Sequence, residues 1–338
     1  MIHTAKKVVT FGEVMLRLST PGNQRFSQAT ALEVTYGGGE ANVAISLSYL
    51  GLSALHVARF PDHMVGRAVS QYLRKHGVDT SYILNGGQKM GSYFMEVGAG
   101  HRASEIVYDR AGSSFSEIQP DMVDWSKILA DADWFHWSGI TPAISQTVAD
   151  TCLEAIQIAN ELGVKVSGDV HSRKSLWQYG KSPKDIMPAL LRGSDYLIGG
   201  AFDFASIFTD IGEEEDMITT RTKLTSHCPR LIGLIDKDRD ILSASHNRIR
   251  GKYCCENGQL WTSDWFEIDT IVDRVGTGDA YAAGIIYGLM NFDDKRFITQ
   301  FGTAACALKH TIPGDANLVG REDIMALAIG EASGRIKR

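Results

Sequence analysis

Short apolar segments alternate with helical segments along most of the chain, and this alternation constrains the fold more than any other feature of the sequence. The predicted strands are 8–11, 134–139, 164–169, 196–198 and 231–235, and the predicted helices are 40–50, 66–76, 145–162, 184–193, 279–290 and 294–310. Short strands that are mostly apolar are typical of a parallel sheet covered by helices on both faces. We therefore expect an α/β fold with a mainly parallel central sheet.

Three further strand-like segments are inserted between these units. They lie at about 14–19, 91–97 and 104–109, and they alternate apolar and polar residues better than the central strands do. Such alternation is typical of strands that are covered on one face only. We expect a small sheet that projects over the carboxyl ends of the main strands, where ligands bind in open α/β sheets, and that acts as a lid. The alternative is an edge hairpin without a functional role.

Composition sets the class of protein. The 338 residues, 44% of them hydrophobic, suffice for a large core, and we expect one domain over 1–338. The net charge of −6 provides no basic surface for nucleic acid or an anionic membrane. No apolar run approaches the ~18 residues of a membrane span, and the short polar start predicts no signal peptide. Five cysteines without a CxxC pair favour a reducing cytoplasm, and ten histidines without HExxH argue against a dedicated zinc site.

The segment from Asp273 to Gly284 contains a glycine turn that opens directly into a predicted helix. Gly276 and Gly278 permit a sharp turn with uncovered backbone N–H groups, and the helix N-terminus adds a partial positive charge. Asp279 places a carboxylate beside this anion hole, as transfer of a phosphoryl group to a hydroxyl requires. The alternative is an ordinary helix start with Asp279 as a cap, and the segment alone does not decide.

Two motifs taken together resemble the signature of a known family. Gly37-Gly38-Gly39-Glu40-Ala41-Asn42 and Gly276-Thr277-Gly278-Asp279 are similar to motifs of the ribokinase-type (PfkB) carbohydrate kinases, and the resemblance covers nearly the whole chain. Tyr108-Asp109-Arg110 and Ser138-Gly139-Ile140-Thr141-Pro142 resemble the 2-keto-3-deoxygluconate kinase (2-dehydro-3-deoxygluconokinase) branch. The resemblance implies a ribokinase-like three-layer αβα sandwich with a β lid. It also implies ATP as donor, Mg2+ as cofactor and phosphorylation of the 6-hydroxyl of a sugar acid.

The resemblance also implies roles for individual residues. Asp279 is the expected base, and the backbone N–H groups of Gly276, Thr277 and Gly278 are expected to stabilise the transferred phosphoryl group. Gly38 and Asn42 are expected to contact the sugar, because glycine lets backbone approach closely and an amide offers donors and acceptors. The residues expected to contact ATP are Gly276, Gly278, Ser243, Ser245 and Asn247.

A sugar acid carries a carboxylate, and a planar guanidinium can bind a carboxylate through two hydrogen bonds. By resemblance, Arg110 and Arg173 occupy the two arginine positions of this branch. Tyr93 and Tyr108 align with lid tyrosines that resemble the family's substrate contacts. A surface salt bridge is the alternative for each arginine, and the two together favour an acidic sugar over ribose or fructose.

Three segments depart from the family pattern. Gly200 and Asp203 stand where Asn-x-x-Glu is common, which leaves Asp203 as one carboxylate for an indirect role at the metal. His171 stands where an asparagine is usual. The segment 235–240 (Ile-Asp-Lys-Asp-Arg-Asp) is unusually charged, where many relatives have Gly-x-x-Gly.

We therefore expect a cytoplasmic kinase that acts on a small-molecule sugar acid and ATP, binds neither nucleic acid nor membrane, and forms homo-oligomers through its lid. Two alternatives stay open. One is a kinase with a fructose- or ribose-like acceptor, and the other is a catalytically weakened relative that senses a sugar acid or a nucleotide. The departures at Gly200, Asp203 and 235–240 support the weakened relative, whereas the intact Asp279 opposes it.

Overall fold

The computed structural model describes residues 6–171, 174–241, 247–255 and 257–331. The strands are β1 (Lys7–Phe11), β2 (Met15–Ser19), β3 (Glu33–Gly37), β4 (Ser53–Phe60), β5 (Ile83–Asn85), β6 (Ser92–Glu96), β7 (Glu105–Asp109), β8 (Trp134–Ser138), β9 (Lys165–Asp169), β10 (Tyr196–Ile198), β11 (Gly233–Ile241), β12 (Asn247–Cys255), β13 (Leu260–Thr262) and β14 (Phe266–Ile268). The α-helices are α1 (Gly39–Tyr49), α2 (Met64–Lys75), α3 (Trp125–Leu129), α4 (Gln146–Glu161), α5 (Pro183–Arg192), α6 (Ala201–Ala205), α7 (Met217–His227), α8 (Thr277–Asn291), α9 (Lys295–Lys309) and α10 (Arg321–Ala328). Short 3-10 helices lie at Phe115–Glu117, Pro120–Met122, Thr141–Ala143 and Lys174–Leu176.

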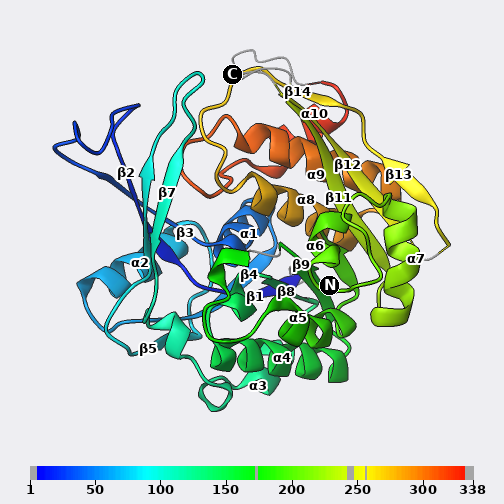
Figure 1. Ribbon diagram of the computed structural model, residues 1–338, viewed down its shortest axis with the longest axis horizontal. Helices are drawn as coiled ribbons and strands as arrows, with labels where there is room; N and C mark the ends of the chain where they lie inside the picture. The colour runs from blue at the N-terminus through cyan, green and yellow to red at the C-terminus, as the bar shows by residue number, and fades with distance from the viewer. Residues whose placement is uncertain (1–5, 172–173, 242–246, 256, 332–338) are drawn as a thin grey trace, which may run out of the picture.

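The main sheet has the strand order β13-β12-β11-β10-β9-β8-β1-β4-β5, with β14 paired to β12. All neighbours from β11 to β5 are parallel, whereas β12, β13 and β14 add antiparallel pairs at one edge. Helices α1, α8 and α9 cover one face and α3, α4 and α5 cover the other (Figure 1). The expected mainly parallel sheet between two helical layers is confirmed.

A separate small sheet has the order β3-β2-β6-β7 and projects from one side of the molecule (Figure 1). Strands β2, β6 and β7 correspond to the three inserted segments of the sequence, so the expected small sheet is confirmed. The sequence analysis missed β3, which pairs with β2 in antiparallel fashion and leads directly into α1. Because β3 is continuous with α1, the small sheet is joined to the helix that carries Asn42.

One large hydrophobic core lies between the main sheet and its helices. Trp125, Trp137, Phe11 and Phe135 are among its largest fully buried side chains. The small sheet has its own cluster of Met15, Tyr93 and Met95, against which Val275 packs. In the part of the chain that the structure describes, no helix has the length and apolar character to span a bilayer.

Helix ends follow the sequence signals that predict them. Ser145 caps α4, because its side chain accepts a 3.3 Å hydrogen bond from the backbone N–H of Val148. Asp294 caps α9 in the same way through the N–H of Arg296 at 2.9 Å. The predicted strand at 231–235 differs most, since β11 begins at Gly233 and continues to Ile241 as one arm of a long hairpin with β12.

Candidate active site beneath the small sheet

A cleft of about 290 Å³ lies between the small sheet and the carboxyl ends of β8 and β9. Its lining residues are Met15, Gly37, Gly38, Gly39, Asn42, Tyr93, Ile106, Tyr108, Ser138, Ile140, Asp169, His171, Arg274, Val275, Gly276, Gly278, Asp279 and Asp315. Segments that are far apart in the sequence therefore meet in one place. The cleft includes seven of the eleven described residues that the sequence analysis assigns to the site, whereas Arg110, Thr277, Asn247 and Asp203 are not in its lining.

Asp279 lies in the first turn of α8, and Asn42 on α1 holds its carboxylate. Asn42 Nδ2 donates a 2.7 Å hydrogen bond to Asp279 Oδ2. Gly276, which precedes α8, has φ of 79°, and a Cβ at this residue would lie only 1.7 Å from the carbonyl oxygen of Asp315. Only glycine fits this turn. The first N–H groups of α8, which have no acceptor inside the helix, are thereby fixed beside a partly exposed carboxylate.

The turn before α1 packs closely against other parts of the chain. A Cβ at Gly37 would lie 1.9 Å from Asp315 Oδ2, and one at Gly38 would lie 2.0 Å from the carbonyl oxygen of Glu13. These glycines therefore let the turn pack closely against Asp315 and Glu13 of the same chain. Gly38 still lines the cleft, and its contact with a sugar stays a prediction.

The two predicted lid tyrosines differ in exposure. Tyr93 is 3% exposed, and its hydroxyl donates a 2.6 Å hydrogen bond to Asp315 Oδ2. Burial and the neighbouring Asp315 carboxylate raise the pKa of Tyr93. Tyr108 is 46% exposed, and its ring centroid lies 5.8 Å from that of Tyr93. Tyr93 therefore forms a fixed wall of the cleft, whereas Tyr108 presents an accessible ring.

A buried charge cluster joins the small sheet to the segment that enters α8. Arg17 on β2 pairs with Asp273 and with Asp315, each at 2.7 Å. Asp273 also accepts a 3.0 Å hydrogen bond from the backbone N–H of Val275. Burial raises the pKa of Asp315, and the positive charge of Arg17 opposes that shift. The turn before Asp279 is thus joined to β2 of the small sheet by ion pairs.

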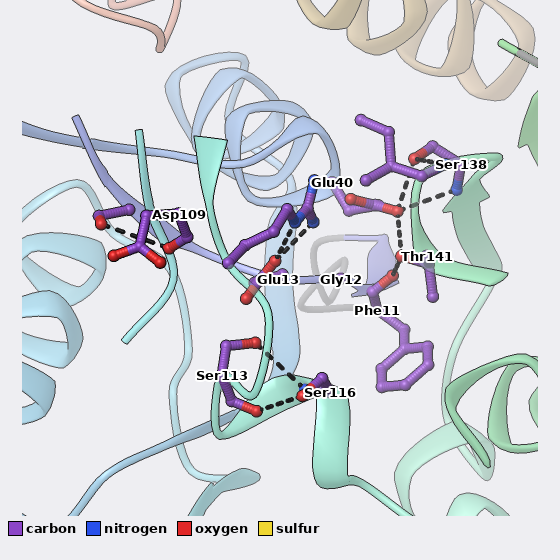
Figure 2. Close-up of polar contacts among 12 residues, drawn as sticks. Phe11, Gly12, Glu13, Glu40, Asp109, Ser113, Ser116, Ser138 and Thr141 are labelled. Carbon is purple, nitrogen blue, oxygen red and sulfur yellow. Dashed lines mark hydrogen bonds and ion pairs between the residues drawn. The ribbon is translucent and has the colours of Figure 1, made fainter. Parts of the chain in front are cut away.

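Arg110, one of the two arginines predicted to bind a carboxylate, is paired with Glu13. Its Nε atom donates a 2.8 Å hydrogen bond to Glu13 Oε2, and a second guanidinium nitrogen contacts the same oxygen. The hydrogen bonds to Glu13 are drawn in Figure 2. The side chains of Arg110 and Glu13 are only 11% and 2% exposed. A carboxylate ligand would therefore share the Arg110 guanidinium with Glu13. Arg173, the other arginine, lies outside the described residues.

Glu40, in the first turn of α1, is a buried carboxylate at the end of β8. Its Oε1 atom accepts hydrogen bonds from the Ser138 N–H at 3.0 Å, the Ser138 hydroxyl at 2.7 Å and the Thr141 hydroxyl at 2.6 Å (Figure 2). Burial raises the pKa of Glu40 to about 7, and the charge of Asp279 adds to the shift. Glu40 therefore holds Ser138, which lines the cleft, in place, and the charge of Asp279 disfavours ionisation of the Glu40 carboxyl.

Asp169 is the last residue of β9, His171 follows the strand, and both line the same cleft. His171 Nδ1 lies 2.7 Å from Asp169 Oδ1. The Asp169 carboxylate raises the pKa of His171. Burial by itself would raise the pKa of Asp169, but His171 and, more weakly, Lys237 hold it well below its usual range. The His171 side chain is half-exposed, so the cleft contains an imidazole that is favoured in its charged form.

The residues expected at the nucleotide are only partly described. Ser243 and Ser245 lie outside the described residues. Asn247 is fully buried, and in the amide orientation that satisfies both groups its oxygen accepts hydrogen bonds from Arg274 at 3.0 and 3.1 Å. Because Arg274 lines the cleft, Asn247 is placed to orient an arginine there.

Asp203, the candidate for an indirect metal role, caps α6. Its Oδ2 atom accepts a 3.2 Å hydrogen bond from the backbone N–H of Gly200. Gly200 borders a separate cavity of about 320 Å³ between α6, α7 and the β11–β12 hairpin. Over the described ranges, no group of three or more His, Cys, Asp or Glu side chains could hold a metal ion.

Several residues that shape the cleft were missed by the sequence analysis as functional candidates. They are Glu13, Arg17, Glu40 and Asp315, all of which are nearly or fully buried. Glu13, Arg17 and Glu40 share one signal, because each is a charged residue in an otherwise apolar or glycine-rich segment, within or directly beside a predicted element. A buried charge needs a partner, so such positions indicate a buried polar network even before the partner is known.

Comparisons with known proteins agree with this geometry. The family described as pfkB family carbohydrate kinase matches residues 5–319. A 2-dehydro-3-deoxygalactonokinase of Haloferax volcanii is 31% identical over 97% of this chain and 98% of its own length. A 5-dehydro-2-deoxygluconokinase of Bacillus subtilis is 26% identical over 89% of each chain. The crystal structure of a 2-dehydro-3-deoxygluconokinase of Thermotoga maritima, 41% identical, covers 96% of this chain and 100% of its own with a TM-score of 0.90. The chain therefore belongs to the pfkB family and is a carbohydrate kinase.

Proposed function

We propose that this kinase transfers the terminal phosphoryl group of ATP to the 6-hydroxyl of 2-keto-3-deoxygluconate. The products are 2-keto-3-deoxy-6-phosphogluconate and ADP. The observation that carries the proposal is the Asp279 carboxylate, held by Asn42 at the start of α8 inside the cleft beneath the small sheet. Such a site joins a base and an anion hole, which are the parts that phosphoryl transfer needs.

The chemistry follows from the positions of these groups. The acceptor oxygen forms a bond to the terminal phosphorus while the bond from that phosphorus to the bridging oxygen breaks, and the electron pair of that bond stays on ADP. Asp279 takes the proton of the attacking hydroxyl. The N–H groups of Gly276, Thr277 and Gly278 stabilise the charge on the phosphoryl oxygens, and the N-terminal dipole of α8 adds to this effect.

We also propose that the reaction requires Mg2+ and that Asp203 helps to hold the ion indirectly. Mg2+ is usually held by one or two carboxylates together with substrate phosphates, and a single carboxylate beside the Gly200 backbone fits an indirect role of this kind. When bound, the ion would neutralise charge on the donor phosphates. Asp203 has a shorter side chain than the glutamate it replaces, so we expect a higher Mg2+ requirement than in relatives with Asn-x-x-Glu.

Acid recognition is proposed for Arg110 and Arg173. Support for an acidic substrate comes from the names of the relatives, which act on 2-dehydro-3-deoxygalactonate, 2-dehydro-3-deoxygluconate or 5-dehydro-2-deoxygluconate. All three are sugar acids. We take 2-keto-3-deoxygluconate as the substrate, because the solved relative of that activity shares 41% identity with this chain.

A panel assay tests the proposal. ADP release is measured with the three sugar acids and with fructose and ribose, at several Mg2+ concentrations, for wild type and for the Asp279→Asn variant. The proposal expects the highest kcat/KM with 2-keto-3-deoxygluconate and loss of turnover in the variant. Preference for a neutral sugar would overturn the acid assignment. Binding of a sugar acid without turnover would instead identify the weakened, sensing relative.

The lid is also proposed as the contact between copies of this chain. Support comes from apolar side chains that the small sheet and its loops expose, with Val34, Phe26 and Val107 at 54%, 40% and 65%. Sedimentation of wild type and Val107→Lys tests this, since the substitution should lower the oligomeric state.

We further propose that residues 1–338 form a single kinase domain. A cytoplasmic location is proposed because all five cysteines, each in the described chain, are free.

A further inference from the structure

The β11–β12 hairpin carries charged side chains on both faces, and those of one face neutralise one another. Asp238 pairs with Arg250 at 2.8 Å and with Lys252 at 2.5 Å. Asp240 pairs with Arg248 at 2.8 Å. Successive side chains of a strand point to opposite faces. Lys237 stands between Asp236 and Asp238 in the strand. Its side chain therefore lies on the face opposite to theirs.

The side chain of Lys237 reaches the start of α8. Its ammonium lies 5.0 Å from the centroid of the Tyr281 ring. The same ammonium lies 4.0 Å from where a Cβ of Gly278 would be, and within the described ranges it is the one group from outside α8 that comes this near. The Tyr281 ring is fixed, because its hydroxyl donates a 2.7 Å hydrogen bond to the carbonyl oxygen of Asp236. Tyr281 therefore holds the Lys237 side chain against the Gly276–Gly278 turn.

Positive charge from two sources converges at this turn. The first N–H groups of α8 form one source. The Lys237 ammonium forms the other, and among the described residues it makes no hydrogen bond or ion pair with the chain. Its charge also lowers the pKa of Asp169 and that of His171, two residues that line the cleft with Asp279. Lys237 is thus directed at the catalytic end of the cleft.

We propose that Lys237 is a further catalytic residue, which binds the phosphoryl group during its transfer. The inference rests on the proposed function for the identity of the donor. A lysine ammonium is a compact charge with three donors, which suits a phosphate whose oxygens move during the reaction. This proposal gives the charged segment 235–240, where many relatives have Gly-x-x-Gly, a role in binding phosphate. Lys237 supplies from β11 a cation that offsets the loss of the Asn-x-x-Glu amide at Gly200.

Nucleotide binding provides a readout that does not depend on turnover. Dissociation constants for ATP and for ADP are measured by calorimetry, without a sugar, for wild type, Lys237→Met, Lys237→Gln and Lys237→Arg. Methionine keeps the apolar stem over Tyr281 and removes the charge. Lys252→Met is the matched control, because it makes the same change on the other face of the hairpin. Thermal unfolding of each variant establishes that it is folded.

The expected result is selective. Lys237→Met and Lys237→Gln should weaken ATP about tenfold or more and leave ADP nearly unchanged, since only ATP carries the group that Lys237 contacts. Lys237→Arg should retain most of the affinity, and Lys252→Met should change neither constant. Equal weakening of ATP and ADP, or no change in the folded variants, would overturn the inference. Wild type that binds neither nucleotide would overturn the proposed function as well, so the two failures are distinct.

Discussion

Asp279 is held by a residue from the other end of the chain, and this makes its role testable by a minimal change. Asp279→Asn keeps the size of the side chain and removes the base. We expect the variant to fold and to bind ATP and sugar acid normally, while kcat falls at least ~10²-fold. Turnover and both binding constants are measured, with Asp293→Asn in the exposed connection between α8 and α9 as control. Near-normal turnover in Asp279→Asn would remove the base assignment.

The Glu13–Arg110 pair leads to a second prediction about single residues. Glu13→Gln leaves the nearly buried Arg110 guanidinium without its counter-charge, which should cost about 3 kcal/mol of stability. A sugar-acid carboxylate could then take the place of Glu13, so the ligand should raise the Tm of Glu13→Gln more than that of wild type. Adding Arg110→Met should abolish the extra rise. Equal ligand-induced shifts in all three proteins would show that the carboxylate does not reach Arg110.

The limits of sequence reasoning are clearest for individual side chains. Asp279 was predictable because its setting is local, consisting of the glycine turn and helix start that precede and follow it. The partners of Arg110 and Tyr93 were not, because Glu13 and Asp315 lie 97 and 222 residues away along the chain. The residue type predicts that a charge needs a partner, but only the fold selects which one. The roles assigned to these residues stay predictions.

Glu40 links α1 to β8, and this link should depend on pH. The pKa of its carboxyl rises from 4.5 to about 7 on folding, mainly through burial. The folded state therefore binds the proton more tightly than the unfolded state. The Glu40 contribution to stability is complete below pH 4.5 and declines as the pH rises toward 7. The loss across this window is on the order of 3 kcal/mol.

Glu40→Gln should remove this dependence while its amide oxygen still accepts from Ser138 and Thr141. We expect the free energy of unfolding of the variant, relative to wild type, to increase between pH 4.5 and pH 8. Urea unfolding across this range measures it. Glu161→Gln, the same change at the exposed end of α4, should show no such trend. A parallel pH dependence in wild type and Glu40→Gln would contradict the prediction.

At the scale of elements, the sequence predicts what periodicity can reveal. The central strands β1, β8 and β9 and the helices α4, α8 and α9 were found because apolar runs mark them, whereas the buried central strand β4 was missed. Strand β3 was missed, since its residues from Glu33 to Tyr36 are exposed or half-exposed and show no core pattern. The β11–β12 hairpin was underestimated because its charges neutralise one another across the strands, a feature that depends on register.

On the scale of the whole molecule, one buried charge cluster joins the small sheet to the segment that enters α8. Arg17 on β2 contacts Asp273, which precedes the α8 turn, and Asp315, whose carbonyl oxygen lies against that turn at Gly276. Tyr93 on β6 donates to the same Asp315. We therefore expect a displacement of the small sheet to shift the N–H groups beside Asp279. Closure of the lid and assembly of the anion hole should accordingly be coupled.

Arg17→Met tests this coupling, because it removes the cation and leaves two carboxylates buried together. Loss of one partner from a buried ion cluster typically costs ~3–5 kcal/mol, and we expect a decrease of that size in the free energy of urea unfolding. Turnover should fall in the same variant even under conditions where it is fully folded, because the turn before Asp279 loses its anchor. Adding Asp315→Asn removes one of the two uncompensated charges and should restore part of the stability. Arg67→Met, in an exposed pair with Asp62 at 3.5 Å, should cost less than about 1 kcal/mol and leave turnover unchanged. If Arg17→Met were as stable and as active as Arg67→Met, the cluster would not couple the lid to the catalytic helix.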